Sequence, residues 1–183
     1  RTMFVNKGLA DKLARRPAGP PKTHVRRLGI MGAGMMGAGV AYVSALAGME
    51  VVLIDSTLEL AEKGKAYSRA LLAKDVERGK RTQADADAIL ARIKPTVSYD
   101  DLAGSDLVIE AVFESREIKA DVTQKTEAVI PKNAVFASNT STLPITGLAQ
   151  ASKRPTQFIG IHFFSPVDKM PLVEIILGKK TSE

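Results

Sequence analysis

Hydrophobic and polar positions along the chain switch between two periods, which predicts strands and helices in alternation. Short apolar runs typical of buried strands cover residues 28–31, 51–54, 106–112 and 134–137. Residues 35–47 and 58–79 have helical patterns, and Ile118, Val122 and Val129 mark one face of a further helix. This alternation predicts an α/β fold with a doubly wound, mostly parallel sheet, whose ligands bind beyond the carboxyl ends of the strands.

Several residues predict where these elements begin and end. Gly48 is expected to cap the carboxyl end of the first helix. Thr82 and Asp85 resemble the capped start of a helix that runs to Ile93. Val97 is expected to open a short strand after that helix.

The last part of the chain predicts an antiparallel hairpin. Two β-rich runs, 158–164 and 171–177, flank a turn centred near Asp168. His162 and Glu174 lie equally far from that centre, so the hairpin places them opposite each other. Such a pair orients an imidazole as a general base. The alternative is that His162 is an ordinary core residue with a satisfied hydrogen bond.

A glycine pattern links the first predicted strand to the first helix. Gly32, Gly34 and Gly37 have the spacing G-x-G-x-x-G, which permits a tight turn, close approach of a pyrophosphate and close packing of helix on strand. An ordinary glycine-rich connection is the alternative. Asp55 ends the next strand 18 residues after Gly37, near the position of the acid that binds ribose hydroxyls. The fingerprint therefore predicts a Rossmann-type domain, and Asp55 favours NAD over NADP because a carboxylate repels a 2′-phosphate.

Composition agrees with one globular domain and excludes several classes of site. The chain has 183 residues, 45% of them hydrophobic and 25% charged. It has no cysteine and only two histidines, so we expect no disulfide and no metal site. No apolar stretch reaches the ~20 residues of a membrane span. We expect a soluble, cytoplasmic bacterial protein and consider the mitochondrial matrix less favoured.

The net charge of +6 is concentrated at the start of the chain. Eight basic residues and one acidic residue fall within residues 1–27, so the remainder is nearly neutral. Residues 1–24 contain prolines and glycines and are predicted to form a basic linker, with the nucleotide-binding domain over 25–183. Because the basic excess lies in the linker, we do not expect nucleic-acid binding. The linker and the absence of an initial methionine lead us to expect a piece of a larger polypeptide.

Polar residues follow the later strands, at the edge of the sheet where ligands are expected. Glu110, Glu114 and Lys119 follow one strand, and the run Ser138-Asn139-Thr140-Ser141 follows the next. Residues of these types are also common as turn formers and on solvated helix faces. Their shared edge favours a functional role.

Four longer motifs resemble the L-3-hydroxyacyl-CoA dehydrogenase family. They are the glycine turn 32–37, Glu110-Ala111-Val112-Phe113-Glu114, and the segments 138–142 and 160–174. The resemblance covers about residues 25–183 and is closer to the multifunctional type, in which an enoyl-CoA hydratase domain precedes the dehydrogenase. It implies NAD-dependent oxidation of an L-3-hydroxyacyl-CoA to a 3-ketoacyl-CoA in fatty-acid β-oxidation, with a thiolase subunit as a further partner.

The resemblance also implies a role for each matching residue. His162 would be the catalytic base, Glu174 its orienting partner and Ser141 a hydrogen-bond donor to the substrate oxygen. The residues implied to hold NAD are Gly32, Gly34, Met35, Met36, Gly37, Asp55, Glu114, Lys119 and Asn139.

One departure from the family concerns its helical C-terminal domain, which contributes a catalytic asparagine and much of the acyl-CoA site. The 183 residues stop before it, so we expect this chain to bind NAD with little or no activity alone. Two alternatives remain open: a non-catalytic NAD-binding module and another hydroxy-acid dehydrogenase. Arg78 and Lys80, with Arg81, form a basic group that either contacts the phosphates of coenzyme A or is a solvated helix end.

Overall fold

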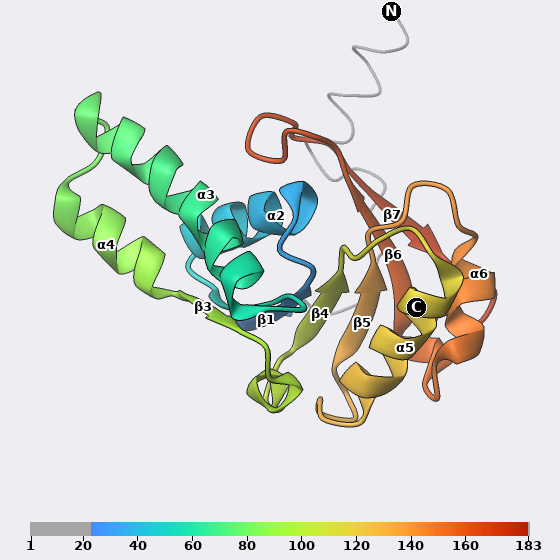
Figure 1. Ribbon diagram of the computed structural model, residues 1–183. Helices are drawn as coiled ribbons and strands as arrows, with labels where there is room; N and C mark the ends of the chain where they lie inside the picture. The colour runs from blue at the N-terminus through green and yellow to red at the C-terminus, as the bar shows by residue number, and fades with distance from the viewer. Residues whose placement is uncertain (1–22, 183) are drawn as a thin grey trace, which may run out of the picture.

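A computed structural model describes residues 23–182 as a seven-stranded sheet flanked by helices (Figure 1). The strands are β1 Arg27–Met31, β2 Glu50–Ile54, β3 Ile93–Thr96, β4 Leu107–Glu110, β5 Val135–Ser138, β6 Phe158–Phe163 and β7 Val173–Leu177. The helices are α2 Met35–Leu46, α3 Leu58–Glu77, α4 Gln83–Ala91, α5 Arg116–Glu127 and α6 Ile145–Leu148. Short 3₁₀ turns η1 Tyr99–Leu102, η2 Ala149–Ala151 and η3 Pro155–Gln157 complete the set.

The strand order is β3-β2-β1-β4-β5-β6-β7, and it confirms the predicted fold class. The first six strands are parallel, and only the β6–β7 pair is antiparallel. The order reverses direction between β1 and β4, which in doubly wound sheets is the place where a dinucleotide binds.

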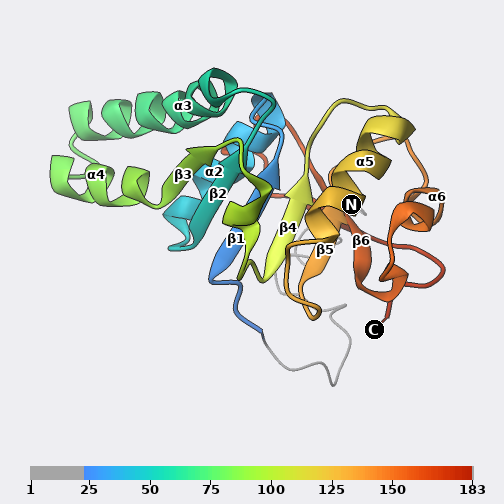
Figure 2. The same cartoon turned by 60° about the horizontal axis from the view of Figure 1, so that its bottom comes forward.

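Helices cover both faces of the sheet, as Figure 2 shows from below. On one face, α2, α3 and α4 enclose a core that includes Val40, Leu53 and Leu72. On the other, η1, α5 and α6 enclose a second core that includes Phe136 and Phe158, whose rings stack with centroids 5.4 Å apart. Strands β1, β2, β4 and β5 are mostly apolar because both of their faces are buried.

The predicted helix ends are confirmed at two places. Gly48 has φ +93° just after the end of α2, a left-handed conformation that glycine adopts without steric cost. The hydroxyl of Thr82 and the carboxylate of Asp85 form a capping box at the start of α4.

The prediction of a strand opening at Val97 is wrong. Strand β3 ends at Thr96, and α4 stops at Ala91 rather than reaching Ile93. Ile93 instead pairs with Val51 and is 1% exposed, whereas Val97 is half exposed. The strand begins early because Ile93 pairs with Val51, and it tolerates Pro95 because β3 lies at the edge of the sheet.

The helix face predicted from Ile118, Val122 and Val129 is correct only in part. Val122 is buried in the second core, but Ile118 is 44% exposed and Val129 follows the end of α5. The hydroxyl of Ser115 accepts a hydrogen bond from the amide of Ile118 and so fixes where the helix begins.

The predicted linker 1–24 lies outside the described residues except for its last two. Among the described helices, none combines the length and apolarity needed to cross a membrane.

Candidate functional site

The glycine turn between β1 and α2 is built by backbone contacts. Gly32 has φ +94°, and its amide donates to the carbonyl of Ile54 on β2 at 2.8 Å. A Cβ atom on Gly37 would lie 1.8 Å from the carbonyl oxygen of Gly32, so no side chain fits there. A Cβ atom on Gly34 would meet nothing within 4 Å. The three glycines therefore serve the turn, an open approach and close packing, as the spacing predicted.

The start of α2 faces the same open space. Gly34 precedes Met35, and no side chain in the described part of the chain caps this helix start, so its first amides remain available to an anion. Met35 is 71% exposed. An amide-lined helix start beside an open glycine fits the pyrophosphate of a dinucleotide.

Asp55 lies at the carboxyl end of β2 and faces the glycine turn. One of its carboxylate oxygens accepts from the amide of Ala33 at 2.7 Å, and the other accepts from the amide of Ser56 at 2.7 Å. These bonds fix the carboxylate beside the turn. Asp55 thus occupies the place expected for the acid that binds ribose hydroxyls.

Two cavities meet at Asp55. One of about 480 Å³ is lined by Val97, Tyr99, Phe113 and Ile118 among others. The second, of about 410 Å³, lies between the glycine turn and α3 and is lined by Leu60, Lys63 and Tyr67 among others. The first has the apolar walls suited to a nucleobase. It also explains the exposure of Ile118, because that side chain faces this cavity.

The predicted pairing in the hairpin is confirmed. His162 on β6 lies opposite Glu174 on β7, and Nδ1 of the imidazole is 2.9 Å from Oε2 of the carboxylate. A carboxylate only accepts hydrogen bonds, so this contact favours the tautomer with hydrogen on Nδ1, and in the neutral imidazole Nε2 then has a free lone pair. The imidazole also packs against the ring of Phe164, with centroids 4.6 Å apart. This geometry holds one tautomer in one orientation.

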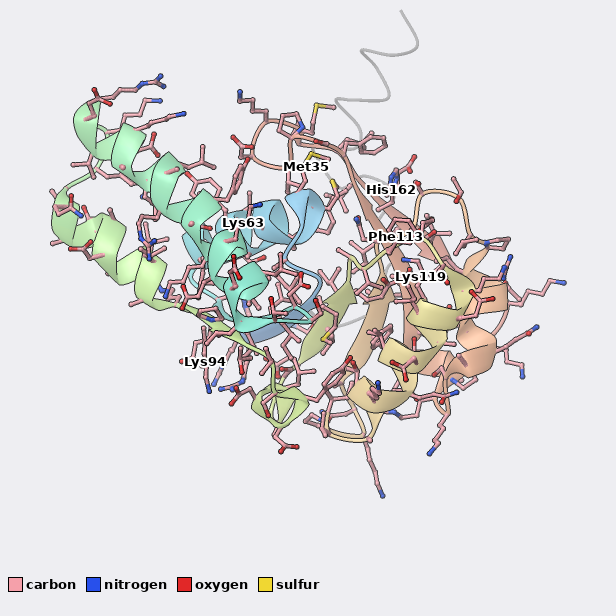
Figure 3. The ribbon with its side chains drawn as sticks, viewed as in Figure 1. Met35, Lys63, Lys94, Phe113, Lys119 and His162 are labelled. Atoms are coloured by element: carbon pink, nitrogen blue, oxygen red, sulfur yellow. The ribbon has the colours of Figure 1, made fainter. Side chains whose placement is uncertain are left out.

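The loop between β6 and β7 docks on the nucleotide-binding half of the domain. Val167 is buried against Gly39 of α2, where an added Cβ atom would be 2.9 Å from it. The hydroxyl of Tyr67 on α3 donates to Asp168 at 3.1 Å, and the hydroxyl of Ser165 lies 3.6 Å from the sulfur of Met35. Figure 3 accordingly shows Met35, Phe113 and His162 toward the same upper end of the sheet, with Lys94 at the other end.

Two carboxylates share one lysine at the carboxyl end of β4. Nζ of Lys119 lies 2.9 Å from both oxygens of Glu110 and 3.1 Å from Oε2 of Glu114. Burial raises the pKa of Glu110 despite the nearby Lys119 charge. Partial burial also acts to raise the pKa of Glu114, but hydrogen bonds from Thr140 and Lys119 outweigh it and lower that pKa to about 2.

Residues 139–141, which follow β5, differ in burial: Asn139 and Thr140 lie at least partly inside, and Ser141 is exposed. Asn139 uses its side-chain oxygen to accept from the amide of Phe163, next to His162, at 2.9 Å. Ser141 is exposed, and its side chain has no hydrogen-bond partner within residues 23–182. Its hydroxyl is therefore free to bind a ligand.

Two of the predicted substrate contacts lie elsewhere. Arg78 and Lys80 are exposed in the turn between α3 and α4, at the far left of Figure 1 and away from the hairpin. Within residues 23–182, no three His, Cys, Asp or Glu side chains are grouped to hold a metal ion.

Sequence reasoning assigned no role to the cavity residues Lys63, Tyr67 and Phe113. The spacing of Lys63 and Tyr67, one helical turn apart, carried a signal, because both follow Asp55 on one face of the next helix. Phe113 carried another, since it is a large apolar residue just beyond a strand end.

Comparison with known proteins identifies the family. The model of the 3-hydroxyacyl-CoA dehydrogenase, NAD binding domain, matches residues 27–183. The chain belongs to this family. The resemblance drawn from the motifs and the prediction of NAD as cofactor are therefore confirmed for this 3-hydroxyacyl-CoA dehydrogenase domain.

Similar proteins carry related names. The fatty acid oxidation complex subunit alpha of Psychrobacter cryohalolentis is 42% identical over 182 residues, which is 99% of this chain and 25% of that protein. The subunit of the same name from Acinetobacter baylyi is 48% identical over 159 residues, covering 87% of this chain and 22% of that protein. The chain thus spans about a quarter of the length of these relatives.

Solved structures confirm the fold. The (S)-3-hydroxybutyryl-CoA dehydrogenase of Ralstonia eutropha superposes with a TM-score of 0.84 at 42% identity, over 87% of this chain and 56% of that one. The dehydrogenase part of multifunctional enzyme 1 from C. elegans gives a TM-score of 0.76 at 29% identity, over 87% of this chain and 36% of that one.

Proposed function

We propose that this domain takes part in the NAD-dependent oxidation of an L-3-hydroxyacyl-CoA to a 3-ketoacyl-CoA in fatty-acid β-oxidation. The observation that carries the proposal is the His162–Glu174 pair, held at 2.9 Å, on a hairpin whose loop docks beside the glycine turn. A domain that only bound NAD would have no use for an oriented proton acceptor at that position. The names of the relatives support this substrate class.

The free Nε2 of His162 is the group that accepts the hydroxyl proton of the substrate. Glu174 accepts a hydrogen bond from Nδ1–H of His162, which leaves Nε2 as the basic nitrogen and stabilises the imidazolium that forms when Nε2 takes the proton. The exposed hydroxyl of Ser141 donates a hydrogen bond to the substrate oxygen. When bound, NAD⁺ supplies the acceptor for the hydride that leaves the same carbon.

The residues that would hold NAD are those of the glycine turn and the adjoining strand ends. The amides of Met35, Met36 and Gly37 at the start of α2 would donate to the pyrophosphate, and Asp55 would bind the ribose hydroxyls. We also propose that Glu114, Lys119 and Asn139 lie beside the nicotinamide half of NAD when it is bound.

Partners and location follow from the relatives as further parts of the proposal. An enoyl-CoA hydratase domain in the same polypeptide and a thiolase subunit are consistent with relatives named as the alpha subunit of a fatty acid oxidation complex. We infer a cytoplasmic location because these relatives are bacterial.

Calorimetric titration of the 183-residue chain with NADH, and then with acetoacetyl-CoA, tests the two halves of the site separately. We expect NADH to bind, and turnover to be slight, because the chain spans 56% of a solved dehydrogenase of this family. Absence of NADH binding would contradict the cofactor assignment. Full activity in the isolated chain would contradict the need for further residues.

His162→Gln tests the proposed base in the complete polypeptide that carries these residues. Losing one general base should lower kcat by ~10² to 10⁴ and leave NADH affinity nearly unchanged. His24→Gln is the matched control, since His24 is exposed and precedes β1 at the opposite end of the sheet. A small effect of His162→Gln on kcat would reject the assignment.

Arg78 and Lys80 test the proposed contact with coenzyme A. Because both residues are exposed in the turn between α3 and α4, away from the hairpin, replacing both with alanine should leave the KM for acyl-CoA and kcat unchanged, whereas a several-fold rise in KM would support the contact. Steady-state kinetics of the complete polypeptide decides this, and an unchanged KM means that they are a solvated helix end.

A further inference from the structure

The exposed Ser141 lies between two threonines that bond to the same carboxylate oxygen. Thr140 donates its hydroxyl to Oε1 of Glu114, and Thr142 donates its hydroxyl to the same atom at 3.0 Å. The amide of Thr142 adds a third bond to Oε1 at 3.3 Å. One carboxylate oxygen therefore holds the residues on both sides of Ser141.

The other oxygen of Glu114 is anchored in the interior. Oε2 lies 3.1 Å from Nζ of Lys119, and the Lys119 side chain is only 3% exposed. The same ammonium contacts both oxygens of Glu110, which is 1% exposed and also accepts from the hydroxyl of Ser138. Lys119 therefore links Glu110 on β4 to Glu114, which in turn holds residues 139–143, called here the Ser141 loop.

The Ser141 loop is also tied to the strand that carries His162. Asn139 bonds to the amide of Phe163 on β6, and Thr140 accepts from the amide of Leu143 at 2.9 Å. Buried ion pairs often cost as much free energy as they return, so this network is poorly explained by stability alone. A fixed position for the Ser141 hydroxyl relative to the imidazole explains it better.

We propose that Glu114, anchored on Lys119 and Glu110, positions Ser141 through the hydroxyl of Thr140. The proposal rests on the proposed dehydrogenase function. Thr140 is the informative position because it is 2% exposed and its hydroxyl both donates to Glu114 and accepts from the loop amides.

Thr140→Val and Thr140→Ser in the complete polypeptide test this positioning. Valine keeps the shape and removes the hydroxyl, so kcat should fall about 10- to 100-fold while the KM for NAD and the NADH affinity stay within about twofold. Serine restores the hydroxyl and should keep kcat within about threefold of the parent. Thr126→Val is the matched control, because the buried hydroxyl of Thr126 has no partner within residues 23–182.

Hydrogen exchange gives a second readout that does not depend on activity. The amide of Leu143 donates to the hydroxyl of Thr140, so Thr140→Val should speed its exchange about tenfold or more, and the amide of Thr142, which also donates to Glu114, should be affected less. Amides of β5 should be unaffected, and Thr140→Ser should retain protection.

The two readouts separate the hypotheses. An inactive parent polypeptide contradicts the proposed dehydrogenase function, and exchange still decides whether the loop is held. An active parent whose kcat survives Thr140→Val, a serine variant as poor as the valine variant, or unchanged exchange at Leu143 would each overturn the positioning role.

Discussion

The glycine turn and the β6–β7 hairpin contribute to one candidate site by different physical means. The turn acts through its backbone: Gly37 leaves no room for a side chain, and Gly34 leaves the helix start open. The hairpin acts through side chains, with His162 and Glu174 paired across two strands. The turn follows β1 and contacts β2, two strands whose residues are almost all buried, whereas all five residues of β7 are exposed.

The glycine turn therefore depends on steric space around its backbone, and the hairpin depends on the register of its strands. A backbone-built site fails when any Cβ atom is added, whatever its chemistry. A side-chain pair on a hairpin depends on which residues face each other, because a slip of one residue would send His162 and Glu174 to opposite faces. The docked loop at Val167 and Asp168 protects that register.

The largest effect is expected from Gly37→Ala. The added Cβ atom would overlap the carbonyl oxygen of Gly32, so the turn must open, with loss of NADH binding by at least ~10² and a lower melting temperature. Titration with NADH and thermal unfolding of the chain measure both.

Two further glycine variants sharpen this result. Gly34→Ala places its Cβ atom in open space, so it should weaken NADH binding without changing the melting temperature. Gly147→Ala, whose Cβ atom would touch only the end of Arg116, should affect NADH binding little. Equal loss of stability in the Gly34 and Gly37 variants would contradict the separate roles of these glycines.

A smaller effect is expected from Glu174→Gln in the complete polypeptide. Glutamine keeps the shape but does not hold the imidazole in one tautomer, so kcat should fall roughly 10- to 100-fold, less than for His162→Gln. NADH affinity should be unchanged, since the glycine turn is untouched. Glu59→Gln on the exposed start of α3 is the matched control. A glutamine variant with the parent's kcat would mean that the pair only stabilises the hairpin.

Both regions could be predicted from the sequence, each from a different signal. Glycine spacing reports a steric demand of the backbone, and equal distances from a turn report register, so both follow from position in the chain alone. The pairing of His162 with Glu174 is the clearest example.

The errors fall where tertiary contacts decide. Val97 lost its predicted strand because Ile93 pairs earlier with Val51 at a sheet edge. The burial of Lys119 between Glu110 and Glu114 depends on how α5 packs against β4, which no spacing along the chain encodes. Surface position at a helix start predicted a solvated or ligand-facing lysine instead.

The smallest predicted effect concerns the behaviour of Glu114 in acid. Hydrogen bonds and the Lys119 charge, acting against partial burial, place its folded pKa at about 2, below the ordinary value of 4.5. Its stabilising contribution is therefore complete above pH 4.5 and is lost as the pH falls from there towards 2. Glu110 acts in the opposite direction, because burial raises its folded pKa and protonation then favours the folded state.

Glu114→Gln should therefore lower the melting temperature by about 2–4 °C at pH 7, and this difference should shrink to nothing as the pH approaches 2. Thermal unfolding of both proteins between pH 7 and pH 2 measures the difference directly. Glu62→Gln, at an exposed position on α3, should show no such convergence. A gap that stays constant across this range would mean that shape, rather than ionisation of Glu114, holds the Ser141 loop. In that case the Ser141 loop would depend on steric fit, as the glycine turn does. It would not depend on charge and hydrogen bonding, as the hairpin does.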